Sequence, residues 1–332
     1  MALSTKDKEK PFILIAAAVV GLLVQHVVGH AVAPLLYVTQ IGVFLVILAV
    51  MLPIELSDVG RAAKRVKPTA LAVFINFVFI PLFAWAAGWL VLRRYPDFWV
   101  GAILYTLTPC IGWYLIFTDI AKGNVAWGIA LLPWNVVLQV LLLPVYLYLL
   151  VGKVIPADFW ALSGSVALYL IAPFVLSLAI RRALIATRGR GYFEGSFRQI
   201  LGKVKLWALV LVIVSMFVSQ PPIGFSELAT VGLLVVFLIG FFLALFLIAL
   251  VAGRVFRLSY EDNTTLAFTT TARNSEAVIG VAVSAFPGHP LVYLAIILGP
   301  IVELPMLLLI ARMMLALKDH IGTVPAVEHD AG

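Results

Sequence analysis

Long apolar runs dominate this sequence, and they constrain its fold more than any other feature. Each run is long enough to cross about 30 Å of hydrocarbon. Hydrophobic residues make up 63% of the 332-residue chain and charged residues only 12%, whereas soluble domains carry about 25% charged residues. A soluble core cannot bury this much apolar surface, so the sequence predicts an all-α polytopic protein in a lipid bilayer. The ten predicted spans are approximately 11–30, 34–55, 68–91, 98–121, 124–151, 160–180, 206–221, 227–252, 263–286 and 290–317.

Lysine and arginine gather on one side of the predicted membrane. With a cytoplasmic N-terminus, 19 of the 23 cations lie in cytoplasmic segments, three lie outside, and Arg273 lies within the ninth span. Because cytoplasmic loops are enriched in Lys and Arg, we expect both termini in the cytoplasm and a plasma-membrane location. The net charge of +7 then reflects topology, and no nucleic-acid partner is expected. A cleaved signal peptide ending near Ala31-Val32-Ala33 is the alternative for the first span, although the run is long for one.

A basic segment at 182–205 divides the predicted spans into five and five. Because five is odd, the second half enters the membrane upside down relative to the first, as in inverted-repeat transporters. The predicted units are a first five-helix repeat over 1–155, the sixth helix over 156–181, a basic cytoplasmic loop over 182–205, the rest of the second repeat over 206–318, and a cytoplasmic tail over 319–332.

Helix-breaking and polar residues recur at matching places in the two halves. The fourth span is interrupted at Thr108-Pro109-Cys110, and the ninth, five spans later, is polar over 269–276. The fifth span carries Pro133 and Pro144 in its interior, and the tenth carries Pro300 and Pro305. Interrupted helices at corresponding positions mark the binding sites of inverted-repeat transporters. We therefore predict that broken fourth and ninth helices cross at the midplane, with Pro109 as one helix break.

Cys110 is the single cysteine of the chain. Thr108 and Pro109 resemble the N-cap and first residue of a half-helix, which places Cys110 in the first turn. There the helix dipole favours a thiolate, whereas burial favours the neutral thiol; small apolar filler is the alternative reading. One cysteine excludes a disulfide framework. No nucleotide-binding or metal-ligand motif is present, so we expect no cofactor and no enzymatic activity.

Three ionisable residues are expected at membrane depth, where each is costly unless it is paired or faces water. Glu276 is a candidate proton or cation acceptor, and Arg273 would balance charge in the empty site. Their spacing also allows them to pair on one helix. Glu303, between two prolines of the tenth span, is either a second functional acid or a packing residue. Asn274 and Ser275 supply polar groups around the break.

The motifs in four spans resemble those of a known transporter family. They are Thr-Pro-Cys-Ile at 108–111, Asn135 with Gln139, Asn-Ser-Glu at 274–276, and Gly-Pro-Ile-Val-Glu-Leu-Pro at 299–305. These stretches are similar to the arsenical-resistance permeases of the bile acid/arsenite/riboflavin transporter superfamily, which also includes the bile acid:sodium symporters. The resemblance covers all ten spans in topology.

The resemblance implies export of arsenite, and of antimonite, in exchange for protons. It assigns to Cys110 a transient As(III)–thiol contact and to Glu276 the coupled proton. Thr108, Asn274 and Ser275, which lie at the two breaks, are further candidates for substrate binding. Three positions depart from the family pattern. Pro109 stands where a basic residue is usual, Arg273 where a small or polar one is usual, and Ser275 where an aromatic one is usual.

Two other functions remain open from the sequence. The first is a sodium-coupled symporter of a bile-acid-like organic anion, in which Glu276, Asn274 and the hydroxyls of 269–271 would bind sodium and Arg273 would face the anion. Cys110 discriminates, because only arsenite export requires a thiol. The second is a sensor or scaffold that has lost transport.

Overall fold

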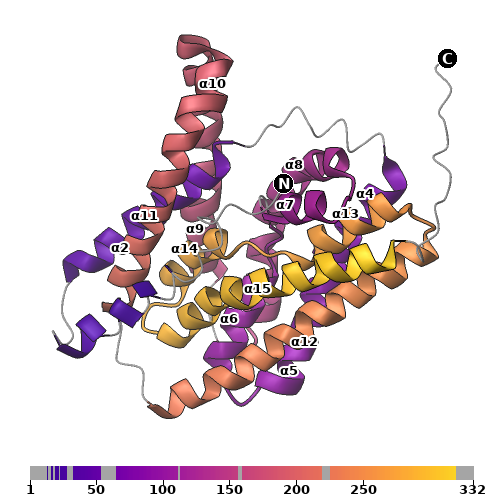
Figure 1. Ribbon diagram of the computed structural model, residues 1–332. Helices are drawn as coiled ribbons and strands as arrows, with labels where there is room; N and C mark the ends of the chain where they lie inside the picture. The colour runs from indigo at the N-terminus through magenta and orange to yellow at the C-terminus, as the bar shows by residue number, and fades with distance from the viewer. Residues whose placement is uncertain are drawn as a thin grey trace.

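The computed structural model describes residues 33–53, 65–110, 113–155, 159–218 and 225–318, together with parts of 13–27. This described part is helical throughout apart from turns and one isolated bridge (Figure 1). The helices, with π-helical turns named η, are α2 (Ala33–Met51), α4 (Val66–Phe74), η2 (Ile75–Phe79), α5 (Ile80–Leu92), α6 (Pro96–Thr106), α7 (Trp113–Ile120), α8 (Val125–Tyr146), η3 (Leu147–Val151), α9 (Phe159–Val166), η4 (Ala167–Ile171), α10 (Ala172–Tyr192), η5 (Phe193–Phe197), α11 (Arg198–Val218), α12 (Phe225–Val255), α13 (Tyr260–Thr271), α14 (Ser275–Ala285) and α15 (Pro290–Leu317).

Five helical segments of the described chain are long and apolar enough to cross a membrane. They are Val66–Leu92, Val125–Val151, Ser163–Ser215, Thr230–Val255 and Pro290–Leu317, and a shorter apolar helix covers Tyr37–Met51. Many large apolar side chains on these helices are exposed, as expected where lipid is the solvent. The all-helical, membrane-spanning fold class is therefore confirmed. The predicted first span lies mostly outside the described residues.

The predicted loop over 182–205 is helical in the structure. α10 continues through the basic stretch to Tyr192, and η5 leads directly into α11. Arginine and alanine favour helix, and Arg190 forms an ion pair of 2.7 Å with Glu194 one turn later. The change of direction is confined to Gly189, whose φ of 79° is a backbone conformation that glycine adopts without steric cost.

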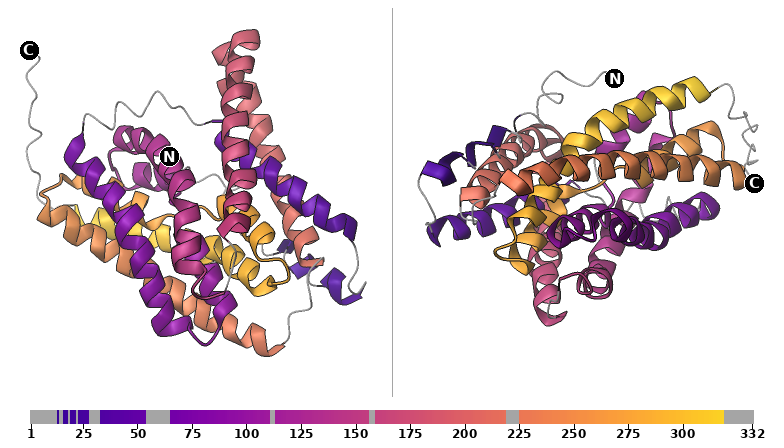
Figure 2. Two further views of the ribbon diagram at one scale, coloured as in Figure 1. Left: turned by 180° about the vertical axis from the view of Figure 1, so that it is seen from behind. Right: turned by 90° about the horizontal axis from the view of Figure 1, so that it is seen from below.

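The helices form two packed groups. α11 and α10 pack against α2 in one group, whereas α6 packs against α5 and α15, and α12 against α13 and α15, in the other. α14 contacts α2, α9 and α15 and so touches both groups. Figures 1 and 2 show the group of α2, α10 and α11 to one side of the crossed α12 and α15. A buried hydrogen bond of 2.9 Å between the Thr39 and Ser215 hydroxyls joins α2 to α11.

Polar side chains tie together the N-terminal ends of α4, α8 and α13. Arg65, at the start of α4, donates two hydrogen bonds of 2.8 and 2.6 Å to the Asp262 carboxylate. The Asn124 amide donates to the same carboxylate at 2.8 Å, and its oxygen caps α8 by accepting from Trp127 N at 3.0 Å. Asp262 lies in the first turn of α13. This network fixes where α13 begins.

Close packing of α6 on α15 requires glycine at position 101, and Gly101→Ala is expected to destabilise the protein. A Cβ at Gly101 would lie 2.5 Å from the Val292 carbonyl oxygen and 2.6 Å from the Ala295 Cβ. Overpacking of this kind costs about 1–3 kcal/mol. Gly240→Ala in α12 is the matched control, because a Cβ there meets nothing within 4 Å. Thermal unfolding of the purified variants should show a lower midpoint for Gly101→Ala alone. Equal midpoints would contradict this account of the contact.

Candidate functional site

Two interrupted helices cross in the interior of the protein. α6 ends at Thr106 and α7 begins at Trp113, while α13 ends at Thr271 and α14 begins at Ser275. The extended residues between them form an antiparallel bridge, with Cys110 N donating to Ala272 O at 3.0 Å and Asn274 N donating to Thr108 O at 2.9 Å. The two predicted breaks therefore meet. Each break satisfies backbone groups of the other, as the membrane interior requires.

The register of the bridge explains why a proline fits at its centre. Pro109 and Arg273 face each other at the position where neither residue donates to the partner strand. Proline lacks an N–H, so no ladder hydrogen bond is lost at Pro109. The N–H of Arg273 is left available, and it donates to Glu303 Oε1 at 3.1 Å. The sequence signal of a break at Pro109 is thus explained by an inter-helix contact.

The expected N-cap role of Thr108 and Pro109 is wrong. Residues 108–110 belong to no helix, with Pro109 in the bridge, and the next described helical residue is Trp113. Cys110 therefore precedes α7 and is not in its first turn. The physical reason is that Thr108 O and Cys110 N bond to the segment between α13 and α14, so these groups are not available for hydrogen bonds within a helix. The Thr108 hydroxyl donates across the crossing to Asn274 O at 3.0 Å, and the Cys110 side chain is buried at 3% exposure.

Asn274 caps the second half-helix, a role that the sequence did not reveal. Its side-chain oxygen accepts from Ala277 N at 3.2 Å, which satisfies one of the free N–H groups at the start of α14. The side-chain nitrogen of Asn274 is buried and has no hydrogen-bond partner among the described residues. Both amide atoms of Gln139 on α8 are in the same condition. Buried polar atoms of this kind are normally paired, so these amides are candidate ligand contacts.

Asn135, by contrast, braces the helices. Its amide nitrogen donates to the Thr269 hydroxyl at 3.3 Å, which joins α8 to the last turns of α13. The Thr270 hydroxyl donates to Leu266 O at 2.8 Å within its own helix, and the Thr271 hydroxyl donates to Ala267 O. The hydroxyl protons of Thr270 and Thr271 are therefore used in hydrogen bonds inside the protein.

Arg273 is almost fully buried, with 3% exposure, in the extended part of the ninth segment. Its guanidinium donates to Thr106 O at 3.1 Å, to Thr271 O at 3.3 Å and to Asn76 Oδ1 at 3.3 Å. It also donates to Thr270 O. The premise that Arg273 and Glu276 share one helix is wrong, because α14 begins only at Ser275. The cation is held instead by the ends of α6 and α13.

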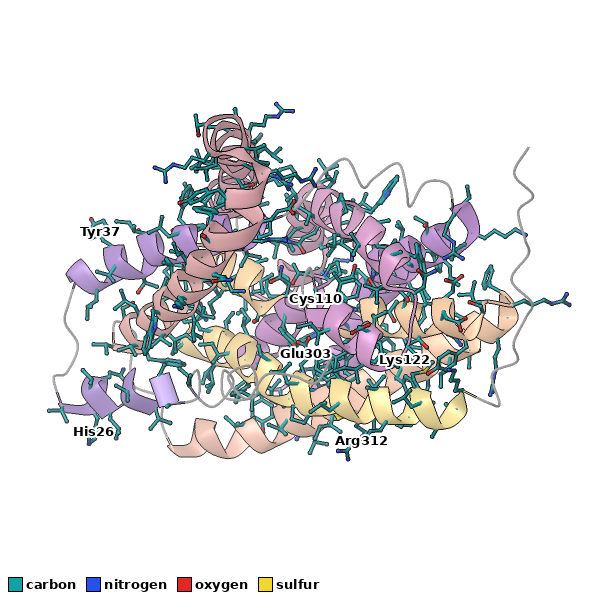
Figure 3. The ribbon with its side chains drawn as sticks, turned by 45° about the horizontal axis from the view of Figure 1, so that its top comes forward. His26, Tyr37, Cys110, Lys122, Glu303 and Arg312 are labelled. Carbon is teal, nitrogen blue, oxygen red and sulfur yellow. The ribbon has the colours of Figure 1, made fainter. Side chains whose placement is uncertain are left out.

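Glu303 lies beside this cation in the middle of α15 and is equally buried. One carboxylate oxygen accepts the Arg273 backbone N–H, and the other accepts the hydroxyl of Tyr105. Figure 3 shows Cys110 and Glu303 in the interior, far from the peripheral His26 and Tyr37. Glu303 thus connects α15 to both broken helices. The backbone of Glu276 lies in the first turn of α14, but its side chain is outside the described residues.

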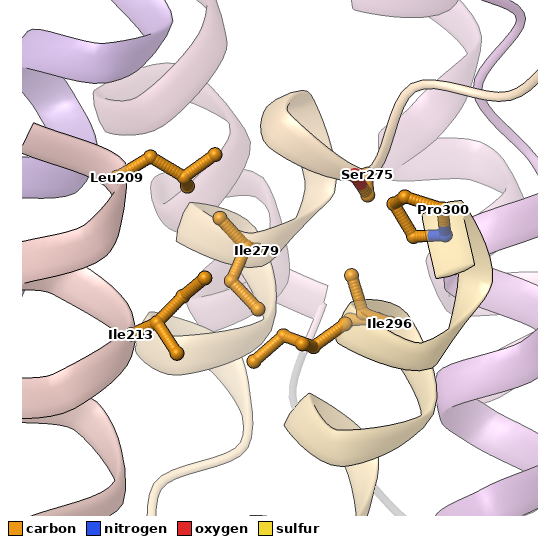
Figure 4. A pocket seen from close by; sticks show the side chains of 7 residues that line it. Leu209, Ile213, Ser275, Ile279, Ile296 and Pro300 are labelled. Carbon is orange, nitrogen blue, oxygen red and sulfur yellow. The ribbon is translucent and has the colours of Figure 1, made fainter. Parts of the chain in front are cut away.

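Ser275, the first residue of α14, lies on the side of the helix crossing that borders α11. It lines a small pocket between α11, α14 and α15, together with Ile279, Pro300 and Ile213 (Figure 4). The remainder of the lining is apolar. This pocket lies between the two packed groups of helices, directly beside the residue that follows Asn274. The described residues contain no cluster of three or more His, Cys, Asp or Glu able to hold a metal ion.

Two residues of the site were missed by sequence reasoning. Asn76 lies within the predicted third span and is fully buried. A polar amide inside an apolar run is costly unless it has a partner, so its presence in the sequence was a usable signal. Tyr105 carried no comparable signal, because it is one of ten tyrosines and its hydroxyl partner is 198 positions away in the sequence.

Comparisons with known proteins agree with the motif resemblance. The Acr3 arsenical-resistance protein of Corynebacterium glutamicum is 26% identical over 250 residues, which covers 71% of this chain and 67% of the relative. The Acr3 arsenical-resistance protein of Alkaliphilus metalliredigens is 22% identical over 283 residues, or 81% and 79% of the two chains. A probable sodium/metabolite cotransporter of Oryza sativa subsp. japonica is 27% identical over 143 residues, or 41% and 32%.

The family assignment comes from a direct match to a family model. The model of the sodium bile acid symporter family matches residues 40–222, which include the first broken helix and Cys110. This match spans more than half of the chain. Together with the apolar helices described above, it identifies a multi-pass membrane transporter, and the protein belongs to the sodium bile acid symporter family.

Proposed function

We propose that this protein is a secondary transporter that exports arsenite, and the chemically similar antimonite, from the cytoplasm in exchange for protons. The observation that carries the proposal is the place of its single thiol. Cys110 is buried where two interrupted helices cross, and interrupted helices are where secondary transporters bind substrate. Similarity to two arsenical-resistance proteins over most of the chain supports the same substrate.

The chemistry of the site suits a ligand that must be bound and then released. As(III) prefers soft sulfur ligands, and one thiol holds it less tightly than a three-thiolate site would. The hydroxyl groups of arsenite need polar partners, and the unpaired side-chain nitrogen of Asn274 is a suitable donor. The Thr108 hydroxyl and Ser275 lie on the same two segments. We assign Cys110 as the metalloid ligand and these three residues as its surroundings.

We further propose a topology of ten spans in two inverted repeats, with both termini in the cytoplasm and the protein in the plasma membrane. The antiparallel crossing of the two broken segments supports this arrangement, as does the recurrence of paired prolines in α8 and α15. The distribution of Lys and Arg supports the orientation. Movement of the α2, α10 and α11 group against the other group would open the Ser275 pocket alternately to the two sides.

Proton coupling is assigned to Glu276, at the start of α14. A carboxyl group can carry the exchanged proton, and the motif resemblance gives this role to the acid of the Asn-Ser-Glu stretch at 274–276. The sodium-coupled alternative is favoured by one observation, the similarity to a probable sodium/metabolite cotransporter over 41% of the chain. The Thr270 and Thr271 hydroxyls donate their protons inside the protein, which leaves their oxygen lone pairs able to bind sodium, so transport under separate gradients must decide between the two.

Everted membrane vesicles containing the full chain test this proposal. The cytoplasmic face is then outside, so export appears as arsenite uptake into the vesicle. We expect uptake when an acidic lumen is imposed, and none from a sodium gradient at equal pH. Vesicles without the protein are the control for leakage. Arsenite uptake driven by sodium, or no arsenite uptake under either gradient, would contradict the proposal. Sodium-driven uptake of an organic anion would establish the alternative.

A further inference from the structure

The guanidinium of Arg273 is enclosed by oxygen atoms from three parts of the chain. Thr106 provides the last carbonyl of α6, Thr270 and Thr271 provide the last two of α13, and Asn76 provides a side-chain oxygen from η2. The C-terminal ends of helices carry partial negative charge and free carbonyl groups. Two such ends therefore converge on one positive group, an arrangement that in transporters also binds free cations.

The contacts of Arg273 argue against a role as an anion receptor. A guanidinium has five N–H donors, and four hydrogen bonds to protein oxygens are present here. Bidentate recognition of a carboxylate or an oxyanion needs two parallel N–H groups, and too few remain. The enclosing oxygens, on the other hand, have the composition of a site for a hard monovalent cation. Carbonyl and amide oxygens are the atoms that replace the water shell of such ions.

We propose that Arg273 is a tethered cation: its guanidinium permanently occupies an oxygen-lined monovalent cation site at the helix crossing, so that no free sodium or potassium enters there. Glu303 completes the charge balance, because its carboxylate accepts the backbone N–H of the same residue. The consequence for transport rests on the proposed function: because Arg273 occupies this site permanently, no free cation that binds here can be coupled to substrate export. The site itself can be tested without any substrate.

The test is the thermal stability of the purified full-length protein in detergent, measured in sodium, potassium, choline and dilute guanidinium chlorides. Wild type should unfold at the same midpoint in sodium and in choline. Arg273→Ala leaves the freed carbonyls without a cation, so its midpoint should be lower in choline and recover by a few degrees, saturably, with sodium, potassium or guanidinium. Asn76→Ala in the same variant should weaken that recovery. Arg65→Ala removes a half-exposed arginine outside the crossing and should give no cation-selective response.

Several outcomes would overturn the inference. One is a sodium-dependent shift in wild type as large as that of Arg273→Ala; another is a folded Arg273→Ala protein whose midpoint is the same in all salts. If Arg273→Ala yields no folded protein in choline, recovery on extraction in sodium or guanidinium supports the inference. If no salt recovers it, Arg273→Lys and Arg273→Met decide: folding of the lysine variant alone supports a tethered cation, and equal recovery refutes it. None of these readouts involves arsenite, so the two proposals can fail separately.

Discussion

Replacement of Cys110 with serine is expected to reduce arsenite export by about tenfold or more while leaving the fold intact. Serine has nearly the same size, but its hard oxygen is a poor ligand for As(III). The bridge between the broken helices uses the backbone N–H of this residue, which serine retains. Loss of even about 1.4 kcal/mol of substrate binding is a tenfold loss of affinity, and a thiol–arsenic contact is worth more. Proton-driven arsenite uptake into everted vesicles should therefore fall by about tenfold or more.

The matched control for this prediction is Thr118→Ser in α7. Thr118 is buried on the half-helix that follows Cys110 and bonds to Tyr114 O in its own helix at 2.8 Å. The substitution is conservative and lies away from the crossing, so export should persist. Both variants should also elute as single species with thermal midpoints close to wild type. A folded Cys110→Ser protein that exports arsenite at the wild-type rate would exclude the thiol as substrate ligand and favour the sodium-coupled alternative.

The crossing could be foreseen from the sequence because its causes are local. A proline and a cluster of polar residues inside apolar runs are incompatible with two uninterrupted membrane helices. Pro109 and Asn274 are both visible as such signals in the sequence. The local conformation was wrong for a reason that is not local. Thr108 resembles an N-cap in isolation, but its carbonyl is engaged by Asn274 N, 166 positions away. Helix capping and inter-segment bridging compete for the same backbone groups.

The surroundings of Arg273 illustrate the same limit. The sequence indicates that a buried arginine needs compensation, and it offers Glu276 as a neighbour three positions away. The structure holds the guanidinium with carbonyls freed at the ends of two helices and with Asn76 from a third segment. Main-chain carbonyls carry no residue identity, so no sequence pattern reveals them as partners. The basic stretch 182–205 is helical in the structure, because its charge indicates exposure but does not exclude helix; its cytoplasmic position stays a prediction.

Removal of the Glu303 carboxylate is expected to destabilise the protein more than any other single change at the crossing. Glu303 accepts the backbone N–H of Arg273 and the hydroxyl of Tyr105, and it is the described acid beside a buried guanidinium. Glu303→Ala leaves the Arg273 N–H and the Tyr105 hydroxyl without this acceptor, and because each hydrogen bond to a charged group contributes about 1.5–3 kcal/mol, we expect a loss of about 3–6 kcal/mol. Thermal unfolding in detergent should show a large fall in midpoint, or no recoverable protein.

Two milder substitutions separate the charge from the hydrogen bonds. Tyr105→Phe removes one hydrogen bond to a charged group and keeps the carboxylate, so it should cost about 1.5–3 kcal/mol. Glu303→Gln keeps the shape and an acceptor for the Arg273 N–H but removes the negative charge, so its stability should fall between those of Tyr105→Phe and Glu303→Ala. If Glu303→Gln matched wild type, the carboxylate would contribute only as an acceptor. The positive charge of Arg273 would then be balanced without Glu303, by the carbonyls at the two helix ends and by the Asn76 side chain, which are the acceptors described for the guanidinium.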